Sequence, residues 1–235
     1  MKYIFFIGFL LISLVSSGQS DNNNPEKNKK NRFDLSLGYS GSVAPGQITD
    51  LMNAYGYNDP TTGWLFNAGE IINHPKFSGP QIFVSGSYTN FYKEKSGIGG
   101  DLRYAYLGEV SGYSESKGYL FVSLHSVSAG LHYTYRPFKH FEFSLGPLIS
   151  LNAGDNTSVE ATKYRNYSFG LDGKLSLVLT EGKVSFWALN AEYIFMSKTA
   201  LGPYETTNYT TNFTIPETQI NFSTLQIGMV YGFKF

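Results

Sequence analysis

The 235-residue sequence contains no cysteine. This absence excludes a disulfide scaffold, a thiolate metal site, a cysteine nucleophile and a lipid-modified N-terminal cysteine. Charged residues are scarce, at 15% of the chain against about 25% in ordinary soluble domains. The 18 basic residues are balanced by 18 acidic ones, so the chain has no net field to attract nucleic acid.

The sequence also lacks the ~20 consecutive apolar residues that a membrane-spanning helix needs. Residues 3–15 form a shorter apolar run, preceded by Lys2 and followed by small residues at 16–18. These are the three parts of a secretory signal peptide, which we expect to cover residues 1–18. Any residence in a membrane must then depend on β-structure, because only helices and closed barrels satisfy their backbone groups in lipid.

Residues 19–31 are polar, contain proline and show no periodicity, so they predict a disordered leader before the first strand. The lysines of this leader, together with Arg32, could contact anionic lipid headgroups. The polar composition of the leader favours a solvated tether instead.

Aromatic residues are abundant instead, with 18 tyrosines and 19 phenylalanines. They alternate clearly in the stretch 218–235, where every second residue is large and apolar and the residues between are small or polar. A period of two predicts a strand with different surroundings on its two sides, which fits a membrane barrel or a soluble sandwich. The large apolar positions are Leu225, Ile227, Met229, Tyr231, Phe233 and Phe235.

The same alternation predicts eight strands along the chain. Three connections are short and four are long, and the two kinds alternate along the chain. This alternation is typical of outer-membrane barrels with long extracellular loops and short periplasmic turns. In the fourth strand, Leu120, Val122 and Leu124 are out of phase with the later apolar residues, so we expect a bulge near His125. The predicted strands are 32–43, 81–92, 98–107, 119–135, 141–152, 167–180, 183–196 and 218–235, and the long loops are 44–80, 108–118, 153–166 and 197–217.

The terminal Phe235, its alternating apolar partners and the loop parity resemble small eight-stranded outer-membrane barrels of the OmpA/OmpX type. The resemblance implies an all-β, closed antiparallel up-and-down transmembrane barrel over residues 32–235, in the outer membrane of a Gram-negative bacterium. It implies contact with outer-membrane lipid and lipopolysaccharide. It also implies that the barrel assembly machinery and periplasmic chaperones recognise the terminal apolar positions. No peptidoglycan-binding domain is expected, since it would need roughly 100 further residues.

Several charged or polar residues fall on the predicted inward face. An eight-stranded barrel is just wide enough for its side chains to fill. We therefore expect these residues to pair and plug the lumen, because unpaired buried charge is costly. A narrow ion or proton path is the alternative. The set comprises Asp34, Asp101, Arg103, His132, Glu142, Asp172, Lys174, Glu192 and Lys234.

The first long loop is predicted to contain a helix, because apolar residues recur from Ile48 at i+3, i+4 and i+7 and Gly56 can end it. We expect this helix to fold over the barrel rim with its apolar side on neighbouring loops, followed by an exposed aromatic cluster. The alternative is a surface for an extracellular ligand or partner. The candidate residues are Ile48, Leu51, Met52, Tyr55, Tyr57, Trp64 and Phe66.

The sequence shows no pattern of an enzyme, a metal site or a cofactor site. Ser126 and Ser128 stand one and three positions after His125, on the opposite face of a simple strand, so a catalytic pair is not expected. The four histidines lack a spacing suited to a shared metal, and residues 97–100 lack the third glycine and following helix of a dinucleotide site. We predict a non-enzymatic outer-membrane barrel with a structural or surface-interaction role. The alternatives are a narrow channel for small or hydrophobic solutes, a barrel-embedded lipid-modifying enzyme, and a secreted soluble barrel.

Overall fold

The computed structural model describes residues 30–62, 71–156, 162–208 and 211–235. The predicted signal peptide and the predicted leader up to residue 29 lie outside the described residues. So do Trp64 and Phe66, two of the predicted loop-surface residues.

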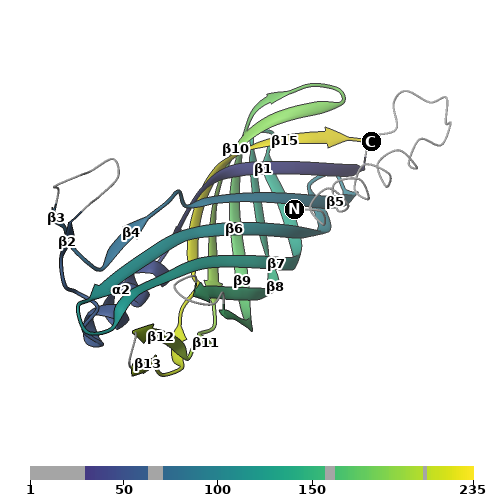
Figure 1. The fold of residues 1–235 in the computed structure, drawn as a ribbon. Coiled ribbons are helices and arrows are strands. Elements are labelled where there is room, and N and C mark those ends of the chain that lie inside the picture. The colour runs from purple at the N-terminus through teal and green to yellow at the C-terminus, as the bar shows by residue number, and fades with distance from the viewer. Residues whose placement is uncertain (1–29, 63–70, 157–161, 209–210) are drawn as a thin grey trace.

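Eight long antiparallel strands form one ring (Figure 1). The hydrogen-bonded order is β6-β5-β1-β15-β10-β9-β8-β7, and a further pairing of β6 with β7 joins the two ends of this order. Strands that follow one another in the chain are therefore neighbours, and the predicted all-β up-and-down architecture is confirmed. The strands are β1 (Asn31–Ser42), β5 (Ile82–Lys93), β6 (Ser96–Ser114), β7 (Gly118–Phe138), β8 (Phe141–Asn156), β9 (Thr162–Glu181), β10 (Ser185–Met196) and β15 (Thr224–Lys234).

The first and last strands of the ring pair directly with each other. The register runs from Arg32 opposite Lys234 to Ser42 opposite Thr224. At its end, the Asn31 amide donates to the Phe235 carbonyl at 3.1 Å, and the Phe235 amide donates back to the Asn31 carbonyl at 2.9 Å. The terminal strand is therefore an integral part of the wall.

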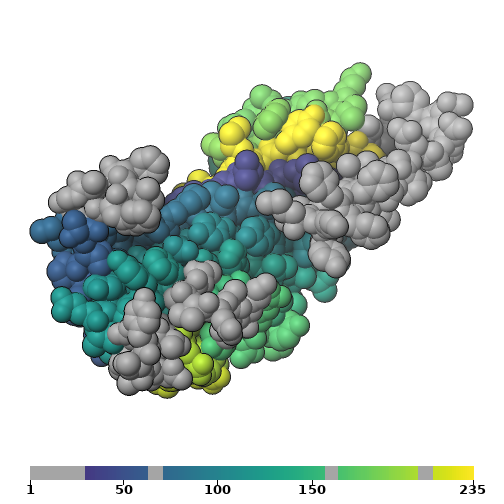
Figure 2. All heavy atoms as spheres, viewed as in Figure 1, coloured from purple at the N-terminus to yellow at the C-terminus, as the bar shows by residue number. Residues whose placement is uncertain are grey.

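The large apolar side chains of the strands point away from the ring. On β15, Leu225, Ile227 and Met229 are between 49% and 55% exposed, whereas Gln226 and Val230 on the alternate positions are buried. A soluble sandwich would bury the large apolar set, because that burial is its main source of stability. The observed exposure is the arrangement of a barrel whose outer surface meets an apolar solvent. On the face seen in Figure 2, the purple-to-teal strands form a continuous surface.

Two of the predicted long loops are largely strand. β6 continues to Ser114 and β7 begins at Gly118, so most of the predicted loop 108–118 is a hairpin; β8 and β9 likewise extend into the predicted loop 153–166. The alternation was misinterpreted here because the inward residues are apolar and the outward residues include polar ones, the reverse of the pattern in the rest of the wall. In this hairpin the inward Val110 is fully buried and apolar, while the outward Glu109 is polar and partly exposed.

The bulge expected in β7 near His125 is wrong. The residues at even positions of β7 face inward at both of its ends, as buried Leu120 and buried Thr134 illustrate. The register shift lies in the partner strand β6, where Leu107 is skipped between the pairs that Tyr106 and Gly108 make with β7. The lining of the ring changes from polar to apolar at this level, and that change looked like a change of phase in the sequence.

The predicted helix is present as α2 (Ala44–Ala54), and it ends before Gly56, whose φ of 70° places it in the left-handed region that glycine favours. Shorter strands lie in the first and the last long connections. Residues 218–220 form one of these short strands, although they were predicted to begin the last wall strand. The short strands are β2 (Thr61–Thr62), β3 (Ile71–Ile72), β4 (Lys76–Ser78), β11 (Thr199–Leu201), β12 (Tyr204–Asn208), β13 (Thr211–Ile215) and β14 (Thr218–Ile220). Within the described ranges, no helix has the length and apolar character needed to cross a membrane.

Candidate functional site

The interior of the ring is the candidate functional site, and its lining changes along the axis. One network of charged side chains lies at the end of the ring with the short turns, and a second lies further along the lumen. An apolar core occupies the end with the long connections. We call these the turn-end network, the Arg103 network and the apolar cap.

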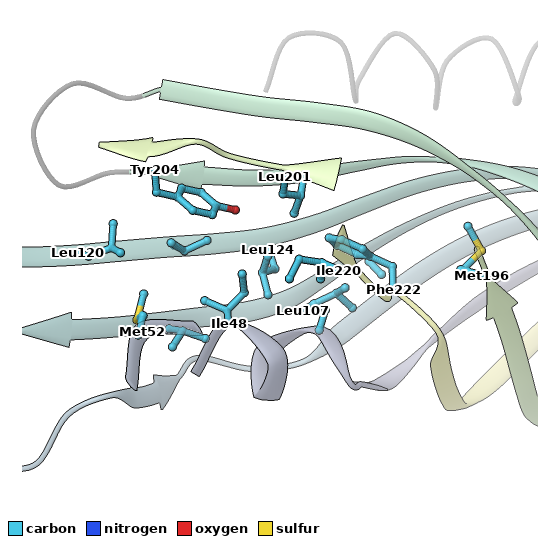
Figure 3. Packing of buried hydrophobic residues seen from close by; sticks show 14 of the residues in the cluster. Ile48, Met52, Leu107, Leu120, Leu124, Met196, Leu201, Tyr204, Ile220 and Phe222 are labelled. Carbon is cyan, nitrogen blue, oxygen red and sulfur yellow. The ribbon is translucent and has the colours of Figure 1, made fainter. Parts of the chain in front are cut away.

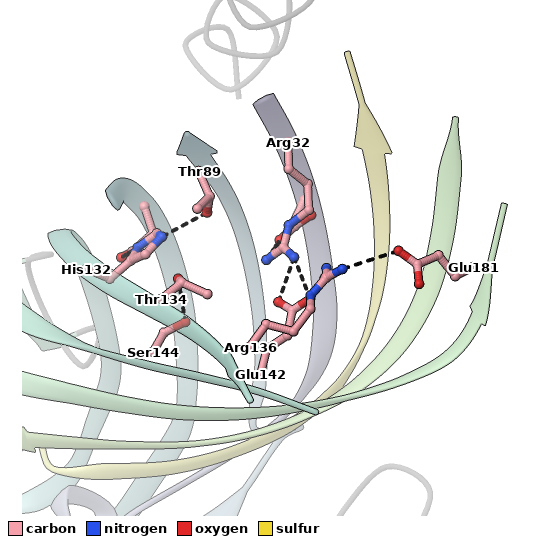
Figure 4. A network of polar contacts seen from close by, with 10 residues as sticks. Arg32, Thr89, His132, Thr134, Arg136, Glu142, Ser144 and Glu181 are labelled. Atoms are coloured by element: carbon pink, nitrogen blue, oxygen red, sulfur yellow. Dashed lines mark hydrogen bonds and ion pairs between the residues drawn. The ribbon is translucent and has the colours of Figure 1, made fainter. Parts of the chain in front are cut away.

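The turn-end network begins with Arg32, a buried residue of β1. Its Nη1 donates to both carboxylate oxygens of Glu142, at 2.7 and 2.6 Å, and its Nη2 lies 2.9 Å from Asp34 (Figure 4). Glu142 belongs to β8, which is four strands from β1 in the ring in either direction. This ion pair therefore spans the full width of the lumen.

Three further residues extend the network to the turns. Arg136 donates to Glu142 and, at 3.3 Å, to Glu181, and Lys234 pairs with the same Glu181 oxygen. Arg136 and Glu181 were missed by sequence reasoning, because both fall at the edges of predicted turns. The turn-end network thus comprises Arg32, Asp34, Arg136, Glu142, Glu181 and Lys234.

Arg103 also crosses the lumen. Its Nη2 is shared by three carboxylates: Asp101 at 3.6 Å, Asp172 at 3.2 Å, and Glu192 in a shorter contact. Glu192 is on β10, again four strands from β6 in either direction. All four side chains are at most 10% exposed. One cation thus holds three buried carboxylates, and this convergence is what makes their burial tolerable.

His132 and Lys174 complete the Arg103 network. The His132 Nδ1 lies 3.5 Å from Asp101, and its Nε2 lies 3.0 Å from the Thr89 hydroxyl (Figure 4). Lys174 is half-buried on the same inward row of β9, where its charge acts on Asp101 and Asp172 at longer range. With Arg103, this cluster sets two fixed cations and one histidine against three carboxylates.

The structure places the predicted lumen residues inside the ring and divides them between the two networks. Arg32 was assigned instead to the edge of the leader, with possible headgroup contact, and that assignment is wrong. The side chain is 5% exposed and points into the lumen. The signal was present in the sequence, because Arg32 stands two positions before Asp34 and so shares its face of the strand.

The apolar cap closes the other end of the ring. The apolar face of α2 points into the ring, where Ala44, Ile48 and Met52 are 0% exposed (Figure 3). The core comprises Ala44, Ile48, Met52, Tyr57, Phe83, Ala105, Leu107, Val110, Leu120, Val122, Leu124, Leu148, Ile194, Met196, Leu201, Tyr204, Ile215, Ile220 and Phe222. These residues come from α2, from the wall strands and from the last long connection, so the loops and the barrel share one core.

Polar contacts fix α2 on both sides. Lys117, at the tip of the β6–β7 hairpin, donates to the Tyr55 carbonyl at the helix C-terminus and lies 5.2 Å from the centre of the Tyr57 ring. On the other side, Gln47 accepts a 2.7 Å hydrogen bond from the Asn221 amide. Gly112 is needed beneath the helix, because a Cβ there would lie 2.8 Å from the Tyr57 Cβ and 3.1 Å from the Tyr57 carbonyl oxygen.

The apolar face of α2 is packed as expected, so the alternative of an exposed ligand surface is wrong for these residues, and the expected exposure of the aromatic cluster is wrong for Tyr57. Ile48, Met52 and Tyr57 are at most 1% exposed, and Leu51 and Tyr55 are partly buried against the same core. The sequence showed that α2 has an apolar face but could not show which way it points. This face packs both on inward residues of the wall strands and on residues of the last long connection.

Tyr204 is a titratable group of the cap. Burial raises the pKa of its hydroxyl well above the ordinary tyrosine value, and Tyr164 and Asp155 nearby raise this pKa further. The phenol therefore stays neutral, which is compatible with its place in an apolar core.

The histidine and serines considered for catalysis lie on opposite sides of the wall. His125 is 2.9 Å from the Tyr104 hydroxyl and packs on the Tyr106 ring, 5.1 Å between centroids, on the outer face. Ser126 and Ser128 face the lumen, where both bond to Ser150 at 2.7 and 3.0 Å. Among the residues that the structure describes, no group of three histidine, aspartate or glutamate side chains is arranged to hold a metal ion.

Aromatic residues lie at both ends of the outward apolar band. Towards the short turns they include Tyr88, Tyr135, Phe141, Phe143 and Trp187, and towards the long connections Tyr39, Tyr104, Tyr167, Phe169 and Phe195, all at least 39% exposed. Between them the wall shows mainly leucine, isoleucine, valine and methionine. Two aromatic belts around an apolar band are the surface pattern of a barrel in a bilayer.

No family model matches the sequence, and no curated protein sequence matches it. Among solved structures, the chain is similar to the outer membrane protein OprG from Pseudomonas aeruginosa, with a TM-score of 0.49 and 15% identity over 88% of this chain and 98% of that one. It is also similar to the Neisserial surface protein A, with a TM-score of 0.44 and 11% identity over 89% and 100% of the two chains. The chain is similar as well to the outer membrane protein AlkL, with a TM-score of 0.42 and 13% identity over 92% of this chain and 98% of that one. The strand ring and the outward apolar band of this chain have the architecture of a small eight-stranded outer-membrane β-barrel.

Proposed function

We propose that this protein is an outer-membrane barrel with a plugged lumen, and that it acts structurally or through its extracellular cap. The observation that carries the proposal is the pair of arginine bridges across the lumen, Arg32 to Glu142 and Arg103 to Glu192. The apolar cap adds a third barrier above them. A solute would have to break a buried ion pair at each charged level, and uncompensated buried charge is strongly unfavourable.

The outward band and its aromatic belts support the membrane placement. An export signal over residues 1–18 and a leader that ends before Asn31, the first residue of β1, remain part of the proposal. Lipid and lipopolysaccharide would then surround the band, with the short turns on the periplasmic side.

The first test is electrical. The mature chain, folded in detergent and inserted into a planar bilayer, is expected to give no stable single-channel steps. The reason is that the arginine bridges fill the lumen at two levels. A porin of known conductance in the same bilayer provides the positive control. Stable and reproducible steps from this chain would overturn the plugged-lumen proposal.

A narrow channel is the second candidate, and one observation favours it. Both polar atoms of the Asn190 side chain and the Oε1 of Gln226 are buried without a hydrogen-bond partner among the described residues. Buried polar groups of this kind are commonly satisfied by internal water. A hydrated segment of lumen would assist a small solute once the cap and the bridges moved, and conductance steps in the same recording would identify it.

The extracellular face of the β6–β7 hairpin is the described surface best suited to partner contact. The Tyr113 and Tyr119 rings lie 4.6 Å apart, and Phe121 stacks on Tyr119 at 5.6 Å. Tyr119 is 44% exposed. Aromatic rings of this kind are enriched where proteins contact partners, because they present rigid apolar area with a polar edge.

Recognition by the assembly machinery belongs to the same proposal, and it predicts an effect at the last residue. Phe235→Ser removes the terminal aromatic side chain but keeps the backbone pairing with Asn31. It is expected to lower the amount of folded protein in the outer membrane several-fold in cells, with little effect on folding in detergent. Phe138→Ser is the matched control, since Phe138 is an outward aromatic at another strand end. Equal losses for both changes, or an equal loss in detergent, would indicate a stability effect instead of recognition.

A further inference from the structure

The outer wall carries a hollow among its apolar side chains. It has a volume of about 540 Å³ and crosses the outward rows of five neighbouring strands, β7, β8, β9, β10 and β15. Its floor contains two small residues, Gly173 and Ala191, in rows otherwise occupied by large side chains. Its walls include Tyr133, Tyr135, Phe143, Leu145, Tyr193 and Leu225.

The strand register explains the hollow. Tyr133, Leu145, Gly173, Tyr193 and Leu225 are partners in successive strands, so they form one row across the wall. The four large residues of this row are between 45% and 63% exposed. A Cβ on Gly173 would meet nothing closer than the Leu145 side chain at 3.9 Å, so the space above the glycine is open.

A cation stands at the turn end of this hollow. Lys139 lies in the turn between β7 and β8, four residues after Tyr135 and four before Phe143, which face each other in the hollow wall. It is exposed and makes no ion pair within the part of the chain that the structure describes. At ~3.3 Å per strand residue, Phe143 lies roughly 7 Å along β8 from Phe141, the residue where the turn that contains Lys139 meets the strand.

We propose that the hollow binds one acyl chain of an anionic phospholipid, with the lipid phosphate close to Lys139. The inference rests on the proposed outer-membrane placement and assigns the lipid to the leaflet on the side of the short turns. Charge complementarity selects an anionic headgroup, and the apolar walls select the chain. A volume of about 540 Å³ is within the range of roughly 300–1,000 Å³ of specific ligand sites.

A second copy of the chain fits the hollow less well than a lipid does. A symmetric dimer sets the same patch of each copy against itself. Two hollows facing each other on convex walls would enclose a void, and voids forfeit the dispersion contacts that stabilise an interface. A flexible acyl chain can follow the hollow and make the contacts that Gly173 and Ala191 leave open.

Native mass spectrometry tests the proposal. The mature chain is folded into vesicles of phosphatidylcholine with a minor fraction of phosphatidylglycerol, extracted in mild detergent, and its retained lipids are counted. The wild type is expected to retain one phosphatidylglycerol in preference to phosphatidylcholine. Gly173→Leu fills the hollow and is expected to lower retention about tenfold. Lys139→Gln is expected to remove the preference for the anionic lipid while a lipid is still retained.

Gly86→Leu provides the matched control. Gly86 faces outward on β5, four strands from β9 in the ring, and a Cβ there would meet Phe33 at 3.5 Å in ordinary contact. This variant is expected to retain lipid like the wild type. An equal loss in Gly86→Leu, no loss in Gly173→Leu, or no retained lipid in the wild type would overturn the proposal.

Heat-dependent migration in gels reports folding into the vesicles independently of lipid retention. If Gly173→Leu does not fold, Ala191→Leu tests the same hollow. A wild-type chain that does not insert would overturn the outer-membrane proposal itself. A chain that inserts but retains no lipid overturns only the acyl-chain site.

Discussion

Replacing Arg103 with alanine is expected to lower the free energy of unfolding by about 3–5 kcal/mol, the cost of breaking a buried ion pair from one side. The change leaves Asp101, Asp172 and Glu192 in the lumen without the guanidinium that all three contact. Urea or guanidinium unfolding in detergent measures the loss, with the fluorescence of Trp187, an outward residue of β10, as a probe.

Two controls separate the ion pair from a general effect of losing a cation. Lys183→Ala removes an exposed cation near the β9–β10 turn and should change the unfolding free energy by less than about 0.5 kcal/mol. Arg103→Met combined with Glu192→Met removes a charge of each sign and is expected to recover part of the loss, because Asp101 and Asp172 remain without the guanidinium. A single Arg103→Ala variant as stable as the Lys183→Ala variant would contradict the proposed role of the network.

Introducing aspartate at Ile48 is expected to release the apolar cap while the barrel stays folded. Ile48 is 0% exposed on the inward face of α2, so the carboxylate would have no polar partner in the core. The free energy for opening of the cap should fall by at least about 3 kcal/mol, because a buried apolar side chain is lost and an unpaired charge is added. Hydrogen exchange of the α2 amides measures this opening directly.

Asn53→Asp is the matched control, because it adds the same carboxylate to an exposed position of the same helix. Its α2 amides should exchange as in the wild type. The Ile48→Asp barrel should still migrate as a folded species in gels and should remain silent in a planar bilayer, since both arginine bridges lie below the cap. Conductance in this variant alone would make the cap the principal barrier and the bridges secondary.

The wall of the barrel was predictable from the sequence because strand alternation is a local property. The face on which each large outward residue lies, such as Ile227 or Leu145, is indicated by the apolar residues two positions away. The same alternation placed most of the charged residues on the inward face. Where the prediction failed, as at Leu120 and at the supposed loop 108–118, the local polarity was reversed because the lumen itself becomes apolar there.

The helix α2 illustrates a different limit. Its periodicity predicted an apolar face, and Gly56 marked its end correctly. The direction of that face depended on where apolar surface was left uncovered after the ring had formed. Residues distant in sequence, among them Leu124 and Phe222, supply that surface.

The sequence by itself determined eight β-strands, their outward apolar band and most of the inward charged residues, because each follows from a period of two along one strand. The closed ring was expected only from the loop pattern and the resemblance to small outer-membrane barrels. Only the tertiary structure decided which inward charges meet. Arg32 and Glu142 are 110 residues apart and Arg103 and Glu192 are 89 apart, yet each pair spans the lumen. Such partners depend on the order and register of all eight strands once the ring has joined, and no single strand carries that information.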